Sequence, residues 1–386
     1  MPYCYIRCIN ERIKNNKVQE SYIFYLKSLI ELGVNPIQIL KEKCFKRDEI
    51  KSKNIEVNNI KFELFKEKEN LKILYSKIYG NFLYIFFGNY ELNKYSIDSE
   101  KNLSNGNIIL KINNKTQYSK KYIQIINNVS FFLVILLKKK KQQFDILTIN
   151  NTISIIYNNN CDYLRSFDNS PYSYLISDEV NNLIYCGTQK GTIFIYQILK
   201  IDEKYIEIHC PYIFKNHSKK ILCINYNNHL NLFADTSSDG FINLYKMPKG
   251  ELIRIYKTND YIFDNVYFSE SYLGCLCLYS INNNEFVTYS LNGSFLHNCK
   301  EEFTNLIFPP FIISDVYFSN HLCYFKKIKS DIFLFIKTLP YFELINRIKI
   351  NEEIKINDCK IIYDKEDKFI YIIEKNKIIK KIRNIL

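Results

Sequence analysis

The chain reads Asn182-Leu-Ile-Tyr-Cys-Gly-Thr-Gln-Lys-Gly-Thr-Ile-Phe-Ile-Tyr196 and, further along, Leu232-Phe-Ala-Asp-Thr-Ser-Ser-Asp-Gly-Phe-Ile-Asn-Leu-Tyr245. Each stretch has an apolar strand, a tight polar turn that ends in glycine, and a second strand of alternating β-branched and aromatic residues. One such unit cannot bury both faces of its own sheet, so it needs neighbours stacked around a ring. The pattern therefore predicts a mostly β protein with a β-propeller fold.

The composition supports one large β domain. Of the 386 residues, 47% are hydrophobic and 16% are aromatic, and the aromatic residues are 32 Tyr and 28 Phe with no Trp. Such rings pack well beside β-branched residues on a pleated sheet. The hydrophobic content is enough for a sizeable core, so the chain as a whole is not expected to be disordered.

The first fifty residues differ from the rest. Apolar residues recur at helical spacing between Ser21 and Leu32, and Gly33 is placed to cap that helix. From Ile55 onward the pattern changes to short strands. We therefore expect a helical segment over residues 1–50 and a propeller over residues 55–386.

Groups of short strands recur about every 40 residues and predict about seven blades. The groups span residues 71–112, 122–157, 174–214, 221–256, 266–299, 315–350 and 358–386. The last group offers three strands, and a spare strand, Asn59–Phe65, precedes the first group. We expect this strand to pair into the last blade and close the ring, because closure removes exposed strand edges.

Residues 216–247 resemble a WD40 repeat. His217 stands at the His of that family's Gly-His pair, and Ser237, Asp239 and Tyr245 stand near its Ser/Thr, Asp and Trp positions. In such repeats these side chains form a buried hydrogen-bonded network between strands and loop, where each polar group must satisfy another. The resemblance implies a structural blade network of these four residues, although Tyr245 places its polar group differently from Trp.

Three glycines are expected to end blade turns, namely Gly191, Gly240 and Gly293. In the stretch that contains Gly191, Thr188 and Tyr196 also match the repeat, but Lys190 stands where the repeat has Asp. We expect that blade to lack the network.

A second resemblance covers the N-terminal helices. The stretch Leu29-Ile-Glu-Leu-Gly-Val-Asn-Pro-Ile-Gln-Ile-Leu-Lys41 resembles the end of a BEACH domain, where a helix and Phe-Gly precede Thr-Pro-x-Gln-Leu. In beige- and neurobeachin-like BEACH proteins this exit leads to a C-terminal WD40 propeller, and Phe286-Val-Thr-Tyr-Ser-Leu-Asn-Gly-Ser294 is similar to a strand and turn of that propeller. The resemblance implies a non-catalytic protein-interaction scaffold in intracellular membrane and vesicle trafficking.

The net charge of +13 fits contact with an anionic membrane or nucleic acid, although Lys is also the default surface residue of this chain. One dense run, Lys138, Lys139, Lys140 and Lys141, is a candidate contact for an anionic surface. We expect other proteins as partners through the propeller faces, with peripheral contact to anionic membrane. A basic propeller that binds RNA or a nuclear complex is the alternative.

No motif predicts catalysis, a cofactor or a metal site. The sequence has no Gly-rich phosphate loop, nucleophile elbow or zinc-ligand spacing, and Asp178-Glu179 is interpreted as a pair of loop charges. Many of the 12 Cys lie in strand-like runs, where thiols act as small apolar groups. Because no signal peptide or membrane-spanning run of about 20 apolar residues is evident, we expect a cytoplasmic, reduced protein without transmembrane segments.

Overall fold

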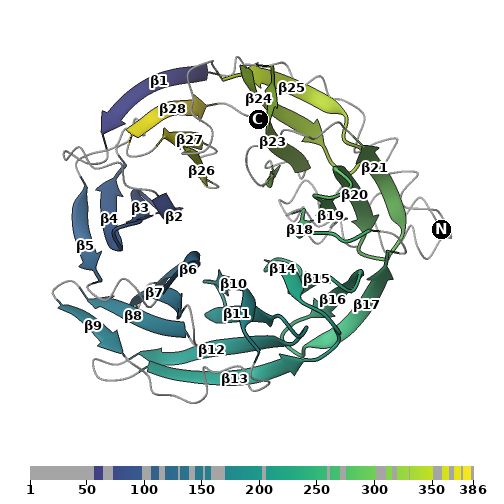
Figure 1. Ribbon diagram of the computed structural model, residues 1–386, viewed down its shortest axis with the longest axis horizontal. Coiled ribbons are helices and arrows are strands. Elements are labelled where there is room, and N and C mark those ends of the chain that lie inside the picture. Colours follow the sequence, from purple (N-terminus) through teal and green to yellow (C-terminus); the bar gives the residue numbers. More distant parts are fainter. Residues whose placement is uncertain are drawn as a thin grey trace, which may run out of the picture. The chain divides into compact units, whose positions relative to one another are not determined.

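Figure 1 shows the computed structural model of the chain. The residues that the structure describes are 56–63, 73–97, 106–112, 118–128, 131–138, 144–150, 153–157, 170–201, 206–258, 261–269, 275–300, 310–314, 320–329, 331–350, 359–364, 369–374 and 377–383. They belong to one compact unit, Glu56–Leu386, and contain strands and turns but no helix. The predicted helical segment over residues 1–50 lies outside the described residues.

Within these ranges the strands form seven four-stranded antiparallel sheets. In six of them, four strands that are consecutive in sequence pair with their immediate neighbours. The first three are β2 Ile73–Tyr79, β3 Phe82–Phe87, β4 Glu91–Ser96, β5 Asn107–Lys111; β6 Tyr118–Asn128, β7 Phe131–Lys138, β8 Phe144–Asn150, β9 Ile153–Tyr157; and β10 Tyr172–Asp178, β11 Leu183–Thr188, β12 Ile193–Ile201, β13 Ile206–Phe214.

The next three sheets repeat this pattern and extend the ring in Figure 1, where β14 and β18 lie nearest the centre in their sheets. They are β14 Ile221–Asn227, β15 Leu232–Ser237, β16 Phe241–Lys246, β17 Glu251–Lys257; β18 Asn265–Phe268, β19 Cys275–Ser280, β20 Glu285–Ser290, β21 Phe295–Lys300; and β22 Phe311–Ser314, β23 Asn320–Ile328, β24 Asp331–Thr338, β25 Leu344–Lys349.

The seventh sheet joins the two ends of the described chain. Its strands β26 Cys359–Asp364, β27 Phe369–Glu374 and β28 Lys377–Arg383 are followed by β1 Glu56–Glu63, which pairs antiparallel with β28 at the outer side. The expected pairing of the spare N-terminal strand into the last sheet is therefore confirmed. The strand spans Glu56–Glu63, so its bounds differ from the predicted Asn59–Phe65. Its register against β28 shifts between Asn59 and Phe62.

One predicted strand group starts too late. The sixth group was expected from residue 315, but its first strand is β22, Phe311–Ser314. Pro310 immediately precedes this strand, and a proline is tolerated at a strand start because no ladder hydrogen bond is lost there. The apolar residues after Pro310 form the first strand of the sixth sheet, ahead of the predicted start.

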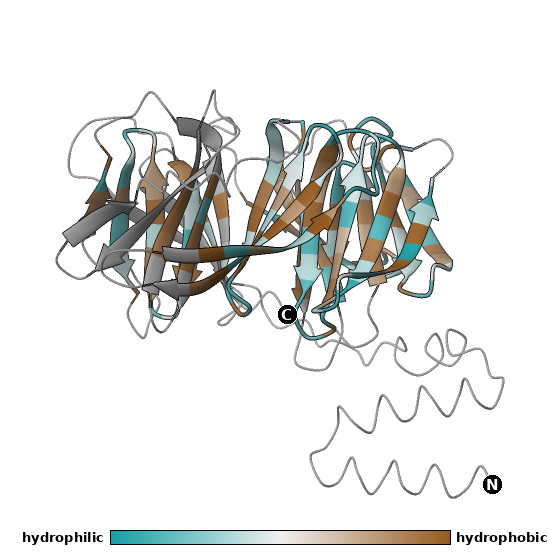
Figure 2. Cartoon of the chain, turned by 90° about the horizontal axis from the view of Figure 1, so that it is seen from below, coloured by the Kyte–Doolittle hydropathy of each residue, from teal (hydrophilic) through white to brown (hydrophobic). Residues whose placement is uncertain are grey.

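The hydrophobic core lies between neighbouring sheets. In Figure 2, brown segments alternate with teal and white ones along the coloured strands. One cluster joins Leu133 and Ile135 of β7 to Ile184 of β11 and Phe194 of β12, and all four side chains are fully buried. Full burial of one such side chain contributes roughly 1.5–3 kcal/mol. These two neighbouring sheets therefore cover each other's apolar faces.

The cysteines whose side chains the structure describes, which the sequence predicted as small apolar groups, carry free thiols. Five of them are buried in strands: Cys186, Cys223, Cys275, Cys277 and Cys323. Burial raises the pKa of the Cys275 thiol to about 11, with a hydrogen bond from Ser269 acting in the opposite direction. Within the described ranges, no helix has the length and hydropathy needed to cross a bilayer.

Candidate functional site

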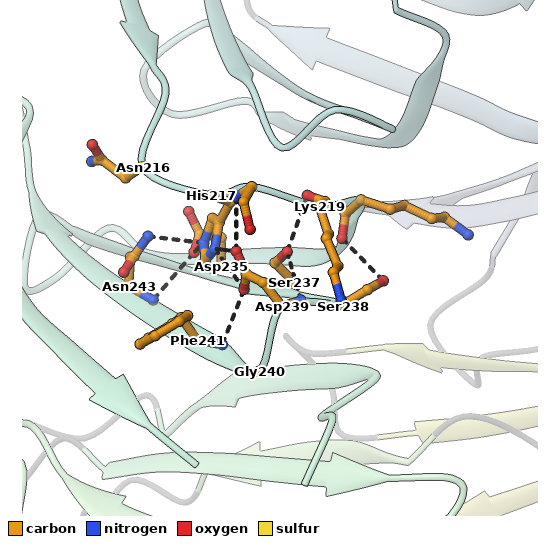
Figure 3. A network of polar contacts seen from close by, with 12 residues as sticks. Asn216, His217, Lys219, Asp235, Ser237, Ser238, Asp239, Gly240, Phe241 and Asn243 are labelled. Carbon is orange, nitrogen blue, oxygen red and sulfur yellow. Dashed lines mark hydrogen bonds and ion pairs between the residues drawn. The ribbon is translucent and has the colours of Figure 1, made fainter. Parts of the chain in front are cut away.

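The candidate site is centred on His217, in the loop between β13 and β14. Its imidazole is 1% exposed and lies between two carboxylates (Figure 3). Nε2 is 2.6 Å from Asp235 Oδ1, and Nδ1 is 3.0 Å from Asp239 Oδ2. An imidazolium can donate from both ring nitrogens, so it suits a position between two acceptors.

Asp239 joins the loop to the turn between β15 and β16. Its carboxylate accepts hydrogen bonds from the backbone N–H of Ser218, at 2.9 Å, and of Phe241, at 3.1 Å. Burial acts to raise the pKa of Asp239, but these two N–H groups and His217 outweigh burial and lower the pKa below its usual value. The ionised side chain therefore fixes the backbone of the loop and of the turn together.

Asp235 is the second carboxylate, and its residue is completely buried in β15. Its Oδ1 accepts a 3.2 Å hydrogen bond from the backbone N–H of Asn243, the residue opposite it in β16. Asn243 Nδ2 also lies 2.8 Å from His217 Nε2. Burial raises the pKa of Asp235, and the hydrogen bond and charge of His217 oppose that rise.

The charge of His217 follows from the same contacts. Burial acts to lower its pKa, but the hydrogen bonds and charges of Asp235 and Asp239 outweigh burial, so its pKa is raised above the ordinary 6.5. The charged imidazolium of His217 therefore lies between two carboxylates. Such pairing offsets the cost of burying a charge.

Tyr245 joins the network through amide groups. Its hydroxyl accepts hydrogen bonds from Asn216 Nδ2, at 3.1 Å, and from Asn243 Nδ2, at 3.2 Å. Its ring is fully buried and stacks on Phe233, with 4.3 Å between the ring centroids. The phenol thus links the start of the loop to β16, one amide away from the imidazole.

Ser237 lies beside the network and holds the loop backbone. Its Oγ donates to the carbonyl of Lys219 at 3.1 Å and accepts from the backbone N–H of Asp239 at 3.3 Å. The structure therefore places Asp239 at one ring nitrogen of His217 and Asp235 at the other. Sequence reasoning missed Asp235 and Asn243.

A signal for Asp235 was present in the sequence. It is an acid that directly follows the apolar run Leu232-Phe-Ala234, and it stands two residues before Ser237. Alternate residues of a strand share a face, so a polar pair at this spacing should project to the same side. Asn243 could be found only from strand pairing, because its role depends on lying opposite Asp235.

The three predicted turn glycines all have positive φ, with values of 89° for Gly191, 85° for Gly240 and 90° for Gly293. Gly191 and Gly240 each follow the second strand of their sheet, whereas Gly293 lies between β20 and β21, the third and fourth strands. A Cβ on Gly191 would lie 2.5 Å from the His217 carbonyl oxygen and 2.7 Å from that of Lys219. Glycine is therefore required where this turn contacts the loop of the next sheet.

The predicted lysine run is only partly described. Lys138 is the last residue of β7, and residues 139–141 lie outside the described residues.

The interpretation of Asp178 and Glu179 as loop charges fits the turn position of Glu179 but is wrong for Asp178, the last residue of β10. Asp178 is completely buried, and its Oδ1 accepts hydrogen bonds from Val180 N and from Asn228 Nδ2, both at 3.0 Å. Glu179 accepts a 2.6 Å hydrogen bond from Tyr79 Oη and pairs with Lys77, both from β2. These carboxylates therefore join separate sheets, because the side chains that satisfy them come from distant parts of the sequence.

Among the residues that the structure describes, no group of three or more His, Cys, Asp or Glu side chains is arranged to hold a metal ion.

Comparison with known proteins identifies the fold. No family model matches the sequence, and no curated protein matches it. Among solved structures, a chain in the crystal structure of the mitotic checkpoint complex is similar over 85% of this chain and 90% of its own length, with a TM-score of 0.53 and 9% identity. At that identity the likeness shows the fold alone. The chain has a WD40-like β-propeller fold, as the repeat pattern predicted.

Proposed function

We propose that this chain is a non-catalytic protein-interaction scaffold whose partners bind loops of the propeller. The observation that carries this proposal is the use of His217, Asp235 and Asp239 to fix the exposed loop 215–220. Buried charges are costly unless they are paired, and here the pairing holds a surface segment. A loop that is ordered before binding loses little conformational entropy when a partner docks.

The number of blades follows from the sheets, and the cellular role proposed for the scaffold follows from the resemblance to BEACH proteins. We infer one blade for each four-stranded sheet, which gives seven blades in a propeller over residues 55–386. The stretch Leu29–Lys41 supports an origin in the C-terminal part of a BEACH–WD40 protein. That origin would place the scaffold in intracellular membrane traffic, in the cytoplasm, with peripheral contact to intracellular membranes.

The scaffold proposal is tested by capture of partners on the purified full chain, followed by cross-linking and mass spectrometry. We expect nuclease-resistant protein partners whose cross-links fall on loop 215–220 and the turns beside it. A His217→Ala chain should lose those cross-links because its loop is released, and a His229→Ala chain should keep them because that side chain is in an exposed turn. Recovery of RNA-dependent ribosomal partners alone would contradict the proposal and favour the RNA-binding alternative.

The BEACH origin has an independent test. The transcript upstream of the codon for Met1 should encode, in frame, the core of a BEACH domain. An upstream sequence that ends in a stop codon without such a core would contradict the family assignment and leave the scaffold proposal untouched.

A further inference from the structure

We propose that the loop between β13 and β14, together with the turn between β11 and β12, is a docking site for an acidic segment of a partner protein. This inference rests on the proposed scaffold function and names the chemistry of its partner. The site consists of four exposed lysines, here called the lysine patch: Lys190, Lys215, Lys219 and Lys220.

Backbone contacts bring the lysine patch together from two sheets. Lys190 precedes Gly191, whose missing Cβ is what allows the turn to lie against the carbonyl oxygens of His217 and Lys219. The backbone N–H of Lys190 donates a hydrogen bond to Ser170 Oγ at 3.2 Å. The turn that carries Lys190 therefore lies directly on the loop that carries the other three lysines.

The loop that presents these lysines has a fixed backbone. The carbonyl of Lys219 accepts from Ser237 Oγ at 3.1 Å, and the carbonyl of Lys220 accepts from Ser238 N at 2.9 Å. The buried side chain of His217 anchors the same loop through its contacts with the carboxylates of Asp239 and Asp235. The main chain is therefore tied down while the lysine side chains extend to solvent, and part of the ordering needed for binding is already done.

Three of the four lysines lie in the loop itself, and their charges are exposed. The acid nearest to them in the loop and turns is Asp239, whose oxygens are occupied by His217, Ser218 N and Phe241 N. Within the described residues, no carboxylate pairs with Lys215, Lys219 or Lys220. These three ammonium groups are therefore available to an anionic partner.

The composition of the patch favours an acidic protein segment over the other anionic partners. Residues 189–191 and 215–220 contain no Phe, Tyr or Trp, and the imidazole of His217 is buried, whereas single-stranded nucleic acid is bound through base stacking on exposed rings. They also contain no apolar side chain that could enter the interfacial region of a membrane. Carboxylates on an extended peptide need only charge complementarity, which lysine ammonium groups provide.

The test is binding of a fluorescent octaglutamate peptide to the full chain, measured by anisotropy. We expect binding that weakens with added salt and is absent for octaglutamine. The charge reversal Lys219→Glu with Lys220→Glu should weaken binding about tenfold or more, because two attractive charges become repulsive. The neutral pair Lys219→Gln with Lys220→Gln should weaken binding less, and both double variants should keep the wild-type melting temperature.

The matched control reverses two other exposed lysines of the same sheet, Lys246 and Lys249. They lie at the far end of β14 from the loop, since Met247 N bonds to Asn231 O in the turn after that strand. This control should change peptide affinity by less than about twofold.

Three outcomes would overturn the inference. Equal peptide binding by wild type and the Lys219→Glu, Lys220→Glu chain would remove the site. Reversal that abolishes binding to phosphatidylserine vesicles, or to a short polyuridine RNA, without effect on the peptide would reassign it to membrane or nucleic acid. Partner capture that persists with the reversed lysines would refute this inference alone, whereas no protein partner on the wild-type chain would refute the scaffold function.

Discussion

Two neighbouring sheets, β10–β13 and β14–β17, have the same strand and turn pattern but different buried chemistry. In the second sheet Asp235 lies opposite Asn243, and in the first sheet the corresponding cross-strand pair is Cys186 and Phe194. Both pairs are buried. One sheet therefore buries an acid at a position where its neighbour buries a thiol.

Near its glycine turn, the first sheet satisfies Thr188 and two tyrosine hydroxyls with partners of its own. Tyr172 Oη and Tyr196 Oη share a 2.9 Å hydrogen bond, and Thr188 Oγ1 accepts from Thr192 N at 3.0 Å. Lys190 occupies the turn position that Asp239 has in the second sheet, so this turn has a lysine where its neighbour has an acid. The comparison teaches that a blade forms without the charged network, and that the network is added where loop 215–220 must be fixed.

The largest expected effect comes from opening the ring of sheets to which both of these sheets belong. Deletion of residues 55–65 removes β1 and leaves the edge of β28 unpaired. We expect the melting temperature to fall by more than about 5 °C, with both sheets lost in one transition and solubility reduced, because open edges associate. An unchanged melting temperature, measured by circular dichroism, would show that closure does not support the ring.

His217→Ala should break the network of the second sheet alone. It leaves Asp235 buried without its nearest charged partner, so we expect unfolding to become easier by about 1–3 kcal/mol. Asp239→Ala should act in the same direction. The exposed His229→Ala is the matched control, with a change within about 0.5 kcal/mol in urea unfolding. Equal effects of the two histidine substitutions would mean that the imidazole is not a buried partner.

The two turn glycines sharpen the comparison. An alanine at either site adopts a left-handed conformation that costs roughly 1–2 kcal/mol. At Gly240 the nearest atom to the new Cβ lies 3.5 Å away, whereas at Gly191 backbone oxygens lie within 2.7 Å. Gly191→Ala should therefore destabilise the chain more than Gly240→Ala, and the reverse order of melting temperatures would contradict the packing of this turn on the loop.

The smallest expected effect is a pH dependence. The raised folded-state pKa of His217 gives stability that is complete below the unfolded pKa of about 6.5 and is lost as pH rises through the folded value. The lowered pKa of Asp239 gives stability that is present above its unfolded value and is lost as pH falls through the folded one. The difference in unfolding free energy between wild type and His217→Ala should therefore shrink on the alkaline side, and a difference that does not vary with pH would contradict this.

The sequence predicted those parts of the molecule that depend on local pattern. Alternating apolar residues and turn glycines located the sheets around Gly191 and Gly240, and the spare strand predicted the pairing of β1 with β28. His217 and Asp239 could be proposed because the repeat resemblance fixes their spacing. The fold comparison, with 9% identity, adds nothing about individual side chains.

The remaining features depend on contacts between distant residues. Asp235 acts through a loop histidine and through Asn243 across the ladder, so its role follows from register and not from spacing alone. Glu179 pairs with Lys77 of another sheet, which no local pattern indicates. The loop and turn that form the lysine patch meet only after two sheets have packed together.

The most direct test of a coupled, buried network is a double-mutant cycle between His217 and Asp235, measured by urea unfolding. The cycle uses His217→Ala, Asp235→Asn and the double variant, because the two side chains lie 2.6 Å apart and are almost completely buried. We predict a coupling free energy between about 0.5 and 3 kcal/mol. Single effects that add to within about 0.3 kcal/mol would contradict the network.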